Sequence, residues 1–417
     1  MPYTRPARSI RVLLSEGSSL SAVQTVNDLG PLGYQLHIVD PAPRCLASWS
    51  RYVQRVHPCP PYGLDPAGYL HAVEAVIASA RIDVLLPTHE QSYLFARVRS
   101  RLAERVGLPV PDFAAVDAVL NKASFSRLLH TLGIPQPPTR VVSTADALVA
   151  TTDFPCFVKT AYGASSHGVW LVHNAGQLRL LAEQLVAGGL LADDAEVIVQ
   201  APAAGEFELT LAAFDRGRLV GAHCCRRLRA GASGSSASKV AVDRPAVREH
   251  LSRLGAHLGW HGALALDYCY DPATGTPRYF DANPRLVEPM PAAIAGVSLS
   301  RLIVHLALGD QLEPAAAAPA GVRTHMLLMA LLGIAEHGGG RIASLKELLA
   351  ALGHRGHYAG SQDELLRPRD DPRTLLPLLL VVGRLLASPS GTARGLRTAA
   401  SGLSLTRELA RRIAALD

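Results

Sequence analysis

The chain has 417 residues, which is long enough for two to four compact units and a sizeable buried core. Hydrophobic residues make up 48% of the sequence and aromatic residues 5%, and the formal net charge of +6 is spread along the chain. Because no segment interleaves basic and aromatic residues, the composition argues against a nucleic-acid-binding protein and fits one that binds a small anionic substrate.

The cysteines and the apolar runs indicate where the protein works. None of the six cysteines shows CxxC or Cys/His ligand spacing, so we expect reduced core thiols in a cytoplasmic protein. The amino-terminal stretch lacks the apolar core of a signal peptide. The longest apolar runs, Met326–Ala335 and Leu375–Gly383, are too short to cross a bilayer. The sequence therefore predicts no transmembrane segment.

The first 114 residues have the alternating pattern of a parallel α/β unit. Apolar strand-like runs at Ile10–Leu14, Leu36–Val39 and Ile82–Leu86 are separated by helical segments, as in a doubly wound sheet. Glu90 follows the third run at its carboxyl end, where ligands collect in such sheets. Glu90 is thus a candidate substrate residue, and a solvated loop position is the alternative.

Two lysines occupy positions that favour contact with an anion. Asn121 can cap a helix whose first turn holds Lys122, although a lysine there is usually solvated. Lys159 ends the apolar strand Phe157–Lys159 and precedes a loop of mostly small residues that runs to Gly168. A lysine in a buried strand needs an anion, and such a loop lets backbone N–H groups approach phosphate oxygens. A plain hairpin turn is the alternative.

The middle of the chain predicts a further strand at Glu196–Gln200 and a hairpin that begins at Glu206. Glu208, on the first strand of that hairpin, has a carboxylate able to accept hydrogen bonds from ribose hydroxyls. The loop Ala230–Ser238 is almost entirely Gly, Ala and Ser, and we expect it to be mobile. The charged residues beside it are substrate contacts or solvated charges, with the two interpretations evenly balanced: Arg226, Arg227 and Lys239.

The stretch from Gly262 to Arg285 predicts a second hairpin that carries acidic residues. Asp267 lies in its first strand, and Asp281 and Asn283 lie two apart in its second, so they share one face. Two carboxylates and an amide oxygen form a hard oxygen set that suits Mg²⁺ bound to nucleotide phosphates. Arg285 keeps the same phase and could clamp a phosphate or a carboxylate. An ordinary hairpin with solvated acids is an equally good interpretation of this stretch alone.

The carboxyl-terminal part reads as an extension. Pro314–Pro319 predicts a linker, and the Leu-rich sequence from Gly321 contains two or three helical patterns. The last stretch, Arg384–Asp417, is basic and amphipathic, which suits contact with a membrane surface or a partner. We favour the third option, in which it packs on the parent domain.

Taken in order, these segments resemble the ATP-grasp superfamily over residues 8 to 312. Each motif is weak singly, but the ordered series is specific. The resemblance implies a mixed α/β and α+β fold with a parallel pre-ATP-grasp domain at 1–114, an ATP-grasp domain at 115–312 and a mostly helical extension at 313–417. Within the second domain, residues 115–200 would form the ATP-lid side and residues 201–312 the metal and substrate side.

The resemblance also implies roles for individual residues. ATP contacts are implied for Lys122, Lys159, Gly163, Ser165, Ser166, Gly168, Gln200, Ala201 and Glu208. Two Mg²⁺ ions, or Mn²⁺ in their place, would be held by Asp267, Asp281 and Asn283. Arg285 would act on the reacting phosphoryl group together with Lys159. Arg226, Arg227 and Glu90 are candidate substrate contacts. Asp281 stands where many members carry Glu, which makes the metal geometry tighter and leaves the ligand type unchanged.

The implied activity is that of a cytoplasmic carboxylate–amine ligase that forms an acyl phosphate and releases ADP and phosphate. Its partners would be small carboxylic acids and amines, and a homodimer is one option because dimers are common in the superfamily. A carboxylase related to biotin carboxylase is the second interpretation, although no biotinyl-carrier segment is evident. A non-catalytic ATP-binding regulator is the third, and the presence of both lysines and all three metal ligands argues against it.

Overall fold

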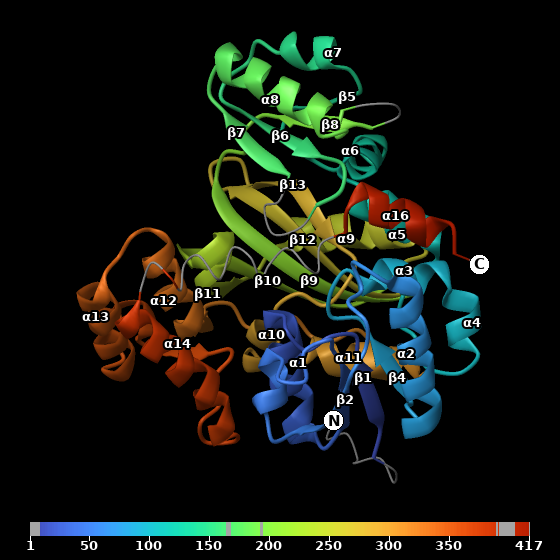
Figure 1. The fold of residues 1–417 in the computed structure, drawn as a ribbon, viewed down its shortest axis with the longest axis vertical. Coiled ribbons are helices and arrows are strands. Elements are labelled where there is room, and N and C mark those ends of the chain that lie inside the picture. The colour runs from blue at the N-terminus through green and yellow to red at the C-terminus, as the bar shows by residue number, and fades with distance from the viewer. Residues whose placement is uncertain (1–8, 164–167, 192–194, 389–390, 392–404, 417) are drawn as a thin grey trace.

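Three β-sheets organise the part of the chain that the computed structural model describes, which is residues 9–163, 168–191, 195–388, 391 and 405–416. A four-stranded sheet lies at the base, a seven-stranded sheet in the middle and a second four-stranded sheet at the top (Figure 1). This mixture of parallel and antiparallel sheets with helices confirms the predicted fold class.

The basal sheet is wholly parallel, in the order β3-β2-β1-β4. Its strands are β1 (Arg11–Leu14), β2 (Gln35–Val39), β3 (Val53–His57) and β4 (Val84–Leu86). Its helices are α1 (Leu20–Leu29), α2 (Pro66–Ala80), α3 (Gln91–Arg97) and α4 (Arg99–Ala103). The sequence predicted three of the strands and missed β3, because this edge strand exposes Gln54 and Arg55 and lacks an apolar run.

The upper sheet is antiparallel, in the order β5-β8-β6-β7. Its strands are β5 (Thr139–Val142), β6 (Cys156–Thr160), β7 (Val169–Val172) and β8 (Val197–Gln200). Helices α7 (Ala145–Val149) and α8 (Ala175–Ala187) cover one face and pack on Val158 and Val199. Because side chains alternate along a strand, Lys159 and Gln200 point away from these helices, toward the central sheet.

The central sheet runs in the order β13-β12-β9-β10-β11-β14-β15. Its long strands are β9 (Glu206–Asp215), β10 (Arg218–Ala230), β11 (Ser236–Val242), β12 (Gly262–Asp271) and β13 (Thr276–Asn283). The prediction of a mobile loop at Ala230–Ser238 was wrong in extent: β10 and β11 pair across it, Ala230 with Ser236, and only residues 231–235 lie between the two strands. Small residues are compatible with strands when their neighbours supply the packing.

Helices join the sheets to one another. Between the basal and upper sheets lie α5 (Phe113–Leu120) and α6 (Lys122–Thr131). Around the central sheet lie α9 (Pro245–Leu258), α10 (Met290–Ile294) and α11 (Leu299–Ala307). The fully buried Trp260, Phe214 and Tyr268 belong to one apolar cluster that also includes residues of α5 and α9. The central sheet therefore shares an apolar core with α5 and α9.

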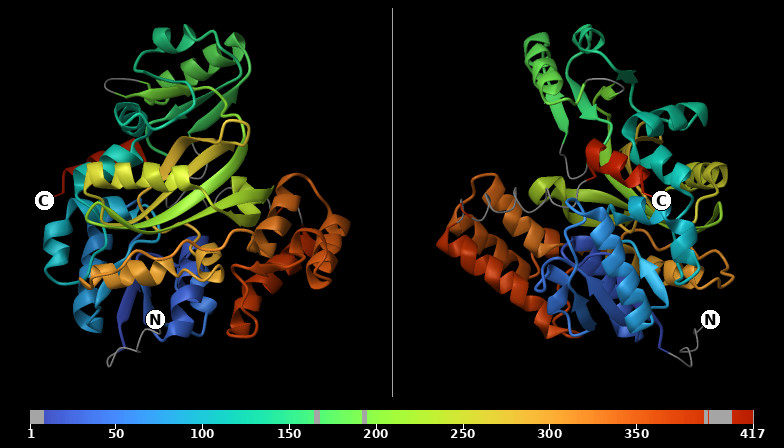
Figure 2. Two further views of the ribbon diagram at one scale, coloured as in Figure 1. Left: turned by 180° about the vertical axis from the view of Figure 1, so that it is seen from behind. Right: turned by 45° about the vertical axis from the view of Figure 1, so that its right-hand side comes forward.

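The carboxyl-terminal part does more than extend the chain with helices. Its strands β14 (Arg323–His325) and β15 (Ser361–Asp363) complete the central sheet, with β14 paired to β11. Helices α12 (Leu327–Glu336), α13 (Arg341–Leu352) and α14 (Leu375–Ala387) gather at one side of the molecule (Figure 2). No helix in the described ranges is long and apolar enough to cross a membrane.

The last helix, α16 (Arg407–Ala414), returns to the body of the protein. Leu409, Ala410 and Ile413 are buried in the same cluster as α3 and α5. In Figure 1 this helix lies beside α5 and α3, far along the sequence from both. The expectation that the basic end packs on the parent domain is confirmed for these residues.

Candidate functional site

The hairpin of β12 and β13 brings the predicted acidic residues onto one face. Asp267 pairs directly with Asp281 across the two strands, and Asn283 lies two residues further along on the same side. Asp267 is the deeper of the two carboxylates. Burial raises the pKa of Asp267 to about 7, with further contributions from the negative charges of Asp281 and Glu288.

Lys122 reaches this hairpin from the start of α6. The Asn121 side chain caps the helix by accepting hydrogen bonds from the backbone N–H groups of Ala123 and Ser124. The cap fixes Lys122 in the first turn, and its Nζ donates to Oδ1 of Asp281 at 2.6 Å. The predicted phosphate lysine and the predicted metal ligand thus neutralise each other in this structure.

Lys159 approaches the same hairpin from the upper sheet. Its Nζ donates to Oε1 of Gln200 at 2.7 Å and to the backbone carbonyl of Phe280 at 3.4 Å, and it lies 5.1 Å from the centre of the Phe280 ring. Burial lowers the pKa of Lys159 to about 8, and the Asp281 carboxylate opposes this shift. Lys122, Lys159, Gln200 and Phe280 line one narrow cavity between the upper and central sheets.

Arg285 links the hairpin to the basal sheet. Its Nη2 donates to Oδ1 of Asn283 at 3.1 Å, and its Nε and Nη2 both approach Oε1 of Glu90 at 3.4 Å. Glu90 follows β4, so a residue chosen only for its place at a strand end does meet the predicted catalytic arginine. Both side chains are buried.

The oxygen donors of the hairpin suit Mg²⁺ by type. Asp267 and Asp281 face one another, and a nearby divalent cation would offset the repulsion that raises the pKa of Asp267. Lys122 and Arg285 already contact Asp281 and Asn283, so a cation would share these side chains with them. Within the described residues, no group of three or more His, Cys, Asp and Glu side chains is placed to hold a metal ion.

Three predicted nucleotide contacts have protein partners in the structure. The Glu208 carboxylate is fully buried and accepts from Nε of Arg244 at 2.9 Å and from Nη2 at 2.5 Å. The backbone N–H of Ala201 donates to the carbonyl of Pro138 at 2.9 Å. The Gln200 side chain joins Lys159 to Oγ1 of Thr139. These groups are thus satisfied internally before any nucleotide arrives.

The predicted substrate arginines on β10 point to separate partners. Arg226 pairs with Glu206 at 2.7 Å. The guanidinium carbon of Arg227 lies 4.0 Å from the centre of the Phe207 ring. Burial lowers the pKa of Arg227, and the Asp267 carboxylate opposes that shift. Of the two arginines, Arg227 is therefore the one that interacts electrostatically with the Asp267 carboxylate of the hairpin.

The predicted phosphate loop is described only at its ends. Gly163 and Gly168 have φ angles of 149° and 76°, a region that favours glycine. A Cβ atom on Gly168 would lie 2.2 Å from Oγ1 of Thr160, so only glycine fits beside β6. Ser165 and Ser166 lie outside the described residues.

A buried charge cluster next to the hairpin was not predicted as a unit. Lys239, which is wholly buried, forms ion pairs with Glu288 and with Glu364, the latter at 2.8 Å. Glu288 has a φ angle of 45°, which is strained for a residue with a Cβ atom. Glu288 lies three positions after Arg285, so its place beside the hairpin could be read from the sequence. Glu364 directly follows β15, and no local motif connects it to Glu288 or Lys239.

Comparison with known proteins adds a limited sequence relationship. The chain matches no model of a known protein family. It is 29% identical over 216 residues to the carbamoyl phosphate synthase large chains of two Thermus thermophilus strains, and the match covers 48% of this chain. The chain spans only 20% of the length of these curated relatives.

Solved structures give a broader match at lower identity. Phosphoribosylamine–glycine ligase from Thermotoga maritima is similar with a TM-score of 0.58 and 16% identity, covering 75% of this chain and 78% of the ligase. The biotin carboxylase domain of Hydrogenobacter thermophilus 2-oxoglutarate carboxylase was solved in complex with MgADP, ADP and bicarbonate. It is similar with a TM-score of 0.57 and 16% identity, covering 72% of this chain and 70% of that domain. L-amino acid ligase from Bacillus licheniformis is similar with a TM-score of 0.54 and 16% identity, covering 73% of this chain and 75% of the ligase. The chain shares its fold with these enzymes.

Proposed function

Because the chain has the ATP-grasp fold, we propose that it is an ATP- and Mg²⁺-dependent ligase that joins a carboxylic acid to an amine. One observation carries the proposal: Lys122 forms an ion pair with Asp281, which lies opposite Asp267, and Lys159 lines the same narrow cavity as Lys122. Two lysines beside two carboxylates form a site for a metal-bound phosphate chain. The names of the solved relatives, which include two ligases and a carboxylase, support an acid as the substrate.

The proposed reaction has two steps. A carboxylate oxygen of the substrate attacks the γ-phosphorus of ATP, the bond from that phosphorus to the β–γ bridging oxygen breaks, and ADP leaves. The amine nitrogen then attacks the carbonyl carbon of the acyl phosphate, inorganic phosphate leaves, and the nitrogen loses its proton to solvent. Because both steps mainly require alignment and charge neutralisation, few acid or base side chains are needed.

The side chains divide this work. Lys159 and Lys122 would hold phosphate oxygens, and Arg285 would orient the reacting phosphoryl group from its contact with Glu90. Asp267, Asp281 and Asn283 would hold Mg²⁺, which when bound screens the charge of the phosphate chain. For Lys122 to reach a phosphate it must leave Asp281, so nucleotide and metal binding should be mutually dependent.

Product release identifies the substrates. Mg-ATP is incubated with pooled carboxylic acids, with pooled amines, with both together and with bicarbonate alone, and ADP and phosphate are measured. We expect ADP only when an acid and an amine are both present. ADP formed with bicarbonate alone would indicate a carboxylase and contradict the ligase. The absence of ADP in every arm, despite tight Mg-ATP binding, would favour a regulatory protein.

A matched pair of substitutions tests the metal site. Asp281→Asn should weaken Mg²⁺-dependent nucleotide binding at least tenfold in a calorimetric titration, because it removes a charge that the cation needs. Asp215→Asn is the control, since Asp215 lies at the turn between β9 and β10. Lys122→Met removes the ion pair with Asp281 but leaves the Asp281 carboxylate in place. It should therefore weaken nucleotide binding even when Mg²⁺ is absent. Equal effects of the two aspartate substitutions would mean that the hairpin is not part of the metal site.

A further inference from the structure

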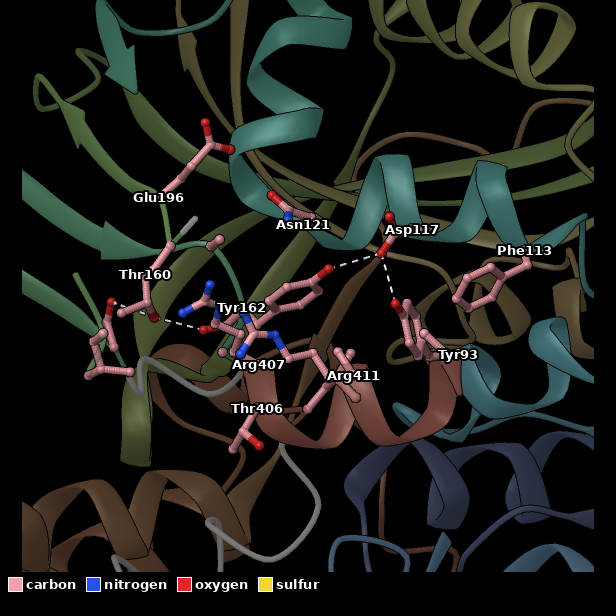
Figure 3. Close-up of a pocket in the computed structure, with 18 of the residues that line it drawn as sticks. Tyr93, Phe113, Asp117, Asn121, Thr160, Tyr162, Glu196, Thr406, Arg407 and Arg411 are labelled. Carbon is pink, nitrogen blue, oxygen red and sulfur yellow. Dashed lines mark hydrogen bonds between the residues drawn. The ribbon is translucent and has the colours of Figure 1, made fainter. Parts of the chain in front are cut away.

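A cavity of 510 Å³ lies under α16, enclosed by α3, α5 and the residues that follow β6 (Figure 3). Gly163 and Gly168, the described ends of the predicted phosphate loop, line this cavity. On its wall, Asp117 accepts hydrogen bonds from the hydroxyls of Tyr93 and Tyr162, at 2.8 and 3.0 Å. The cavity therefore adjoins the site proposed for the nucleotide and is not a site of its own. A surface apart from that site lies on the carboxyl-terminal helices α13 and α14 (Figure 1).

Helix α13 exposes a stripe of large apolar side chains. Ile342, Leu345, Leu349 and Leu352 are 71%, 45%, 67% and 78% exposed. They follow one another at intervals of three, four and three residues, which is the spacing of the seam along which helices pair in a coiled coil. The other side of α13 faces inward, where Ser344 is buried. The stripe therefore has the pattern of a helix-packing surface, and it is open to solvent in the described part of the chain.

Helix α14 adds a second stripe beside the first. Leu376, Leu379 and Leu380 are exposed, whereas Leu378 and Leu385 on the other side of the helix are buried in the core. The two helices pack against each other at one side of the molecule (Figure 2). The seven exposed side chains of the two stripes together form what we call the α13/α14 face. Contiguous apolar patches of this kind are uncommon on a monomer and mark interaction surfaces.

The charges that border the α13/α14 face have one sign. Lys346 on α13 and Arg384 on α14 lie one helical turn from exposed residues of the stripes, so each borders the face. Both are exposed, and neither forms an ion pair with a described residue. Glu347 is the only acidic residue of the two helices, and it is already in an ion pair with Arg229. The face is therefore apolar with a positive border.

We propose that the α13/α14 face binds an amphipathic helix of another protein, whose apolar residues meet the two stripes and whose acidic residues meet Lys346 and Arg384. Two neighbouring helices offer a third helix the packing surface found in helical bundles. Acidic residues beside the apolar seam of that helix select it by charge. This proposal goes beyond the proposed reaction and does not depend on it.

The composition of the chain favours this partner over a second copy and over a lipid surface. No helix in the described ranges carries more than one Asp or Glu, so a second copy could not supply an acidic helix. A second copy would also bring like charges together at the border of the face. Neither α13 nor α14 contains Trp, Tyr or Phe, the side chains that anchor proteins at a lipid surface.

Binding of designed peptides to the full chain tests the proposal. The probe is a fluorescently labelled peptide of about three heptads with leucine at positions a and d and glutamate at positions e and g, where mutual repulsion keeps the peptide monomeric. One control peptide has lysine at positions e and g, and the other has the residues of the probe in an order without the heptad. We expect fluorescence anisotropy to show binding of the probe, at least about tenfold weaker binding of both controls, and weaker binding of the probe at higher salt.

Substitutions in the full chain locate the bound peptide. Leu349→Ser with Leu379→Ser should weaken binding at least about tenfold and leave the melting temperature unchanged, since both side chains are exposed. Leu180→Ser is the matched control, because Leu180 is a similarly exposed leucine on α8. Lys346→Glu with Arg384→Glu should change the preference from the acidic peptide to the lysine peptide.

Other occupants of the face would give different results, each of which would overturn the proposal. Equal binding of the acidic and lysine peptides, or no binding of either, would mean that the face does not select an acidic helix. Binding of phosphatidylglycerol vesicles without binding of the acidic peptide would assign the face to a lipid surface. A dimer in sedimentation that Leu349→Ser with Leu379→Ser abolishes would assign it to a second copy. A lower melting temperature of that variant would mean that the chain itself covers the face.

Discussion

Lys159 is a buried cation whose nearest partners, the Gln200 side chain and the Phe280 carbonyl, are neutral. Its environment disfavours the charge, as the lowered pKa of about 8 indicates, so the site gains most when a phosphate supplies a counter-charge. Lys159→Met should lower ATP-dependent turnover about 100-fold or more and leave the melting temperature unchanged or higher. The measurement is ADP release beside a thermal melt, with Arg127→Met as the surface control. Unchanged turnover would mean that Lys159 takes no part in the reaction.

Asp28 gives the protein a pH dependence that is separate from its site. It lies on α1 and accepts a hydrogen bond from Ser298 at 2.9 Å, and burial raises its pKa from 3.8 to about 6. The raised pKa means that the native state favours the neutral carboxyl. The stability so gained is fully present below pH 3.8 and is lost as the pH rises through about 6.

The amide analogue removes this titration. Asp28→Asn should raise the free energy of unfolding at pH 8 by about 2 kcal/mol, since each pKa unit corresponds to about 1.4 kcal/mol and the variant forfeits attraction to Arg301. The gain should shrink as the pH falls from 6 toward 4. Urea denaturation at pH 5 and pH 8 measures it. A difference that is the same at both pH values would mean that Asp28 does not titrate in this range.

At the scale of elements, Lys239 ties β11 to two distant segments. Its ammonium contacts Glu288, which follows β13, and Glu364, which follows β15. Lys239→Met leaves two buried carboxylates without their cation and should lower the free energy of unfolding by about 3–5 kcal/mol. Urea denaturation provides the measurement. Adding Glu364→Gln should recover part of the loss, and a double variant no more stable than Lys239→Met would contradict this account.

The elements were predictable where local pattern decides them. The alternation of apolar and polar residues predicted that Asp267 and Asp281 share a face, and β12 and β13 place them opposite each other. The cap at Asn121 was also a local signal. By contrast, β14 and β15 are three residues each, and they are strands only because β11 offers an edge to β14 and β14 offers one to β15. Such strands carry too little sequence of their own to be predicted.

The partners within the candidate site were not predictable. Lys122 and Asp281 are 159 positions apart, and the sequence suggested a role for each without indicating that they pair. Glu208 was selected as a free acceptor, but Arg244, at the start of α9, already fills that role. Partner choice depends on how the sheets and helices pack, which residue type and spacing do not specify. The large cavity under α16 was missed for the same reason.

At the scale of the whole molecule, the carboxyl-terminal part is joined to the central sheet through β14, β15 and Glu364, although the sequence predicted an extension. A chain ending at residue 312 would lose β14, β15 and Glu364, and would expose the edge of β11. We expect it to aggregate or to lack a cooperative thermal transition. A chain ending at residue 388 loses only α16 of the described elements and should fold with a lower melting temperature. Equal melting of the full chain and the 312-residue chain would show that the extension is independent.

The position of α16 has a practical consequence for anyone producing this protein. The helix ends at Ala414, three residues before the end of the 417-residue sequence, and it forms a wall beside the residues that follow β6. Any segment fused after residue 417 would be attached close to α16 and to the residues that follow β6, and it would compete with them for space. β1 lies at the opposite end of the molecule, beneath the central sheet (Figure 1). Affinity handles, surface immobilisation and fluorescent fusions therefore belong at the amino-terminal side, away from α16 and the upper sheet.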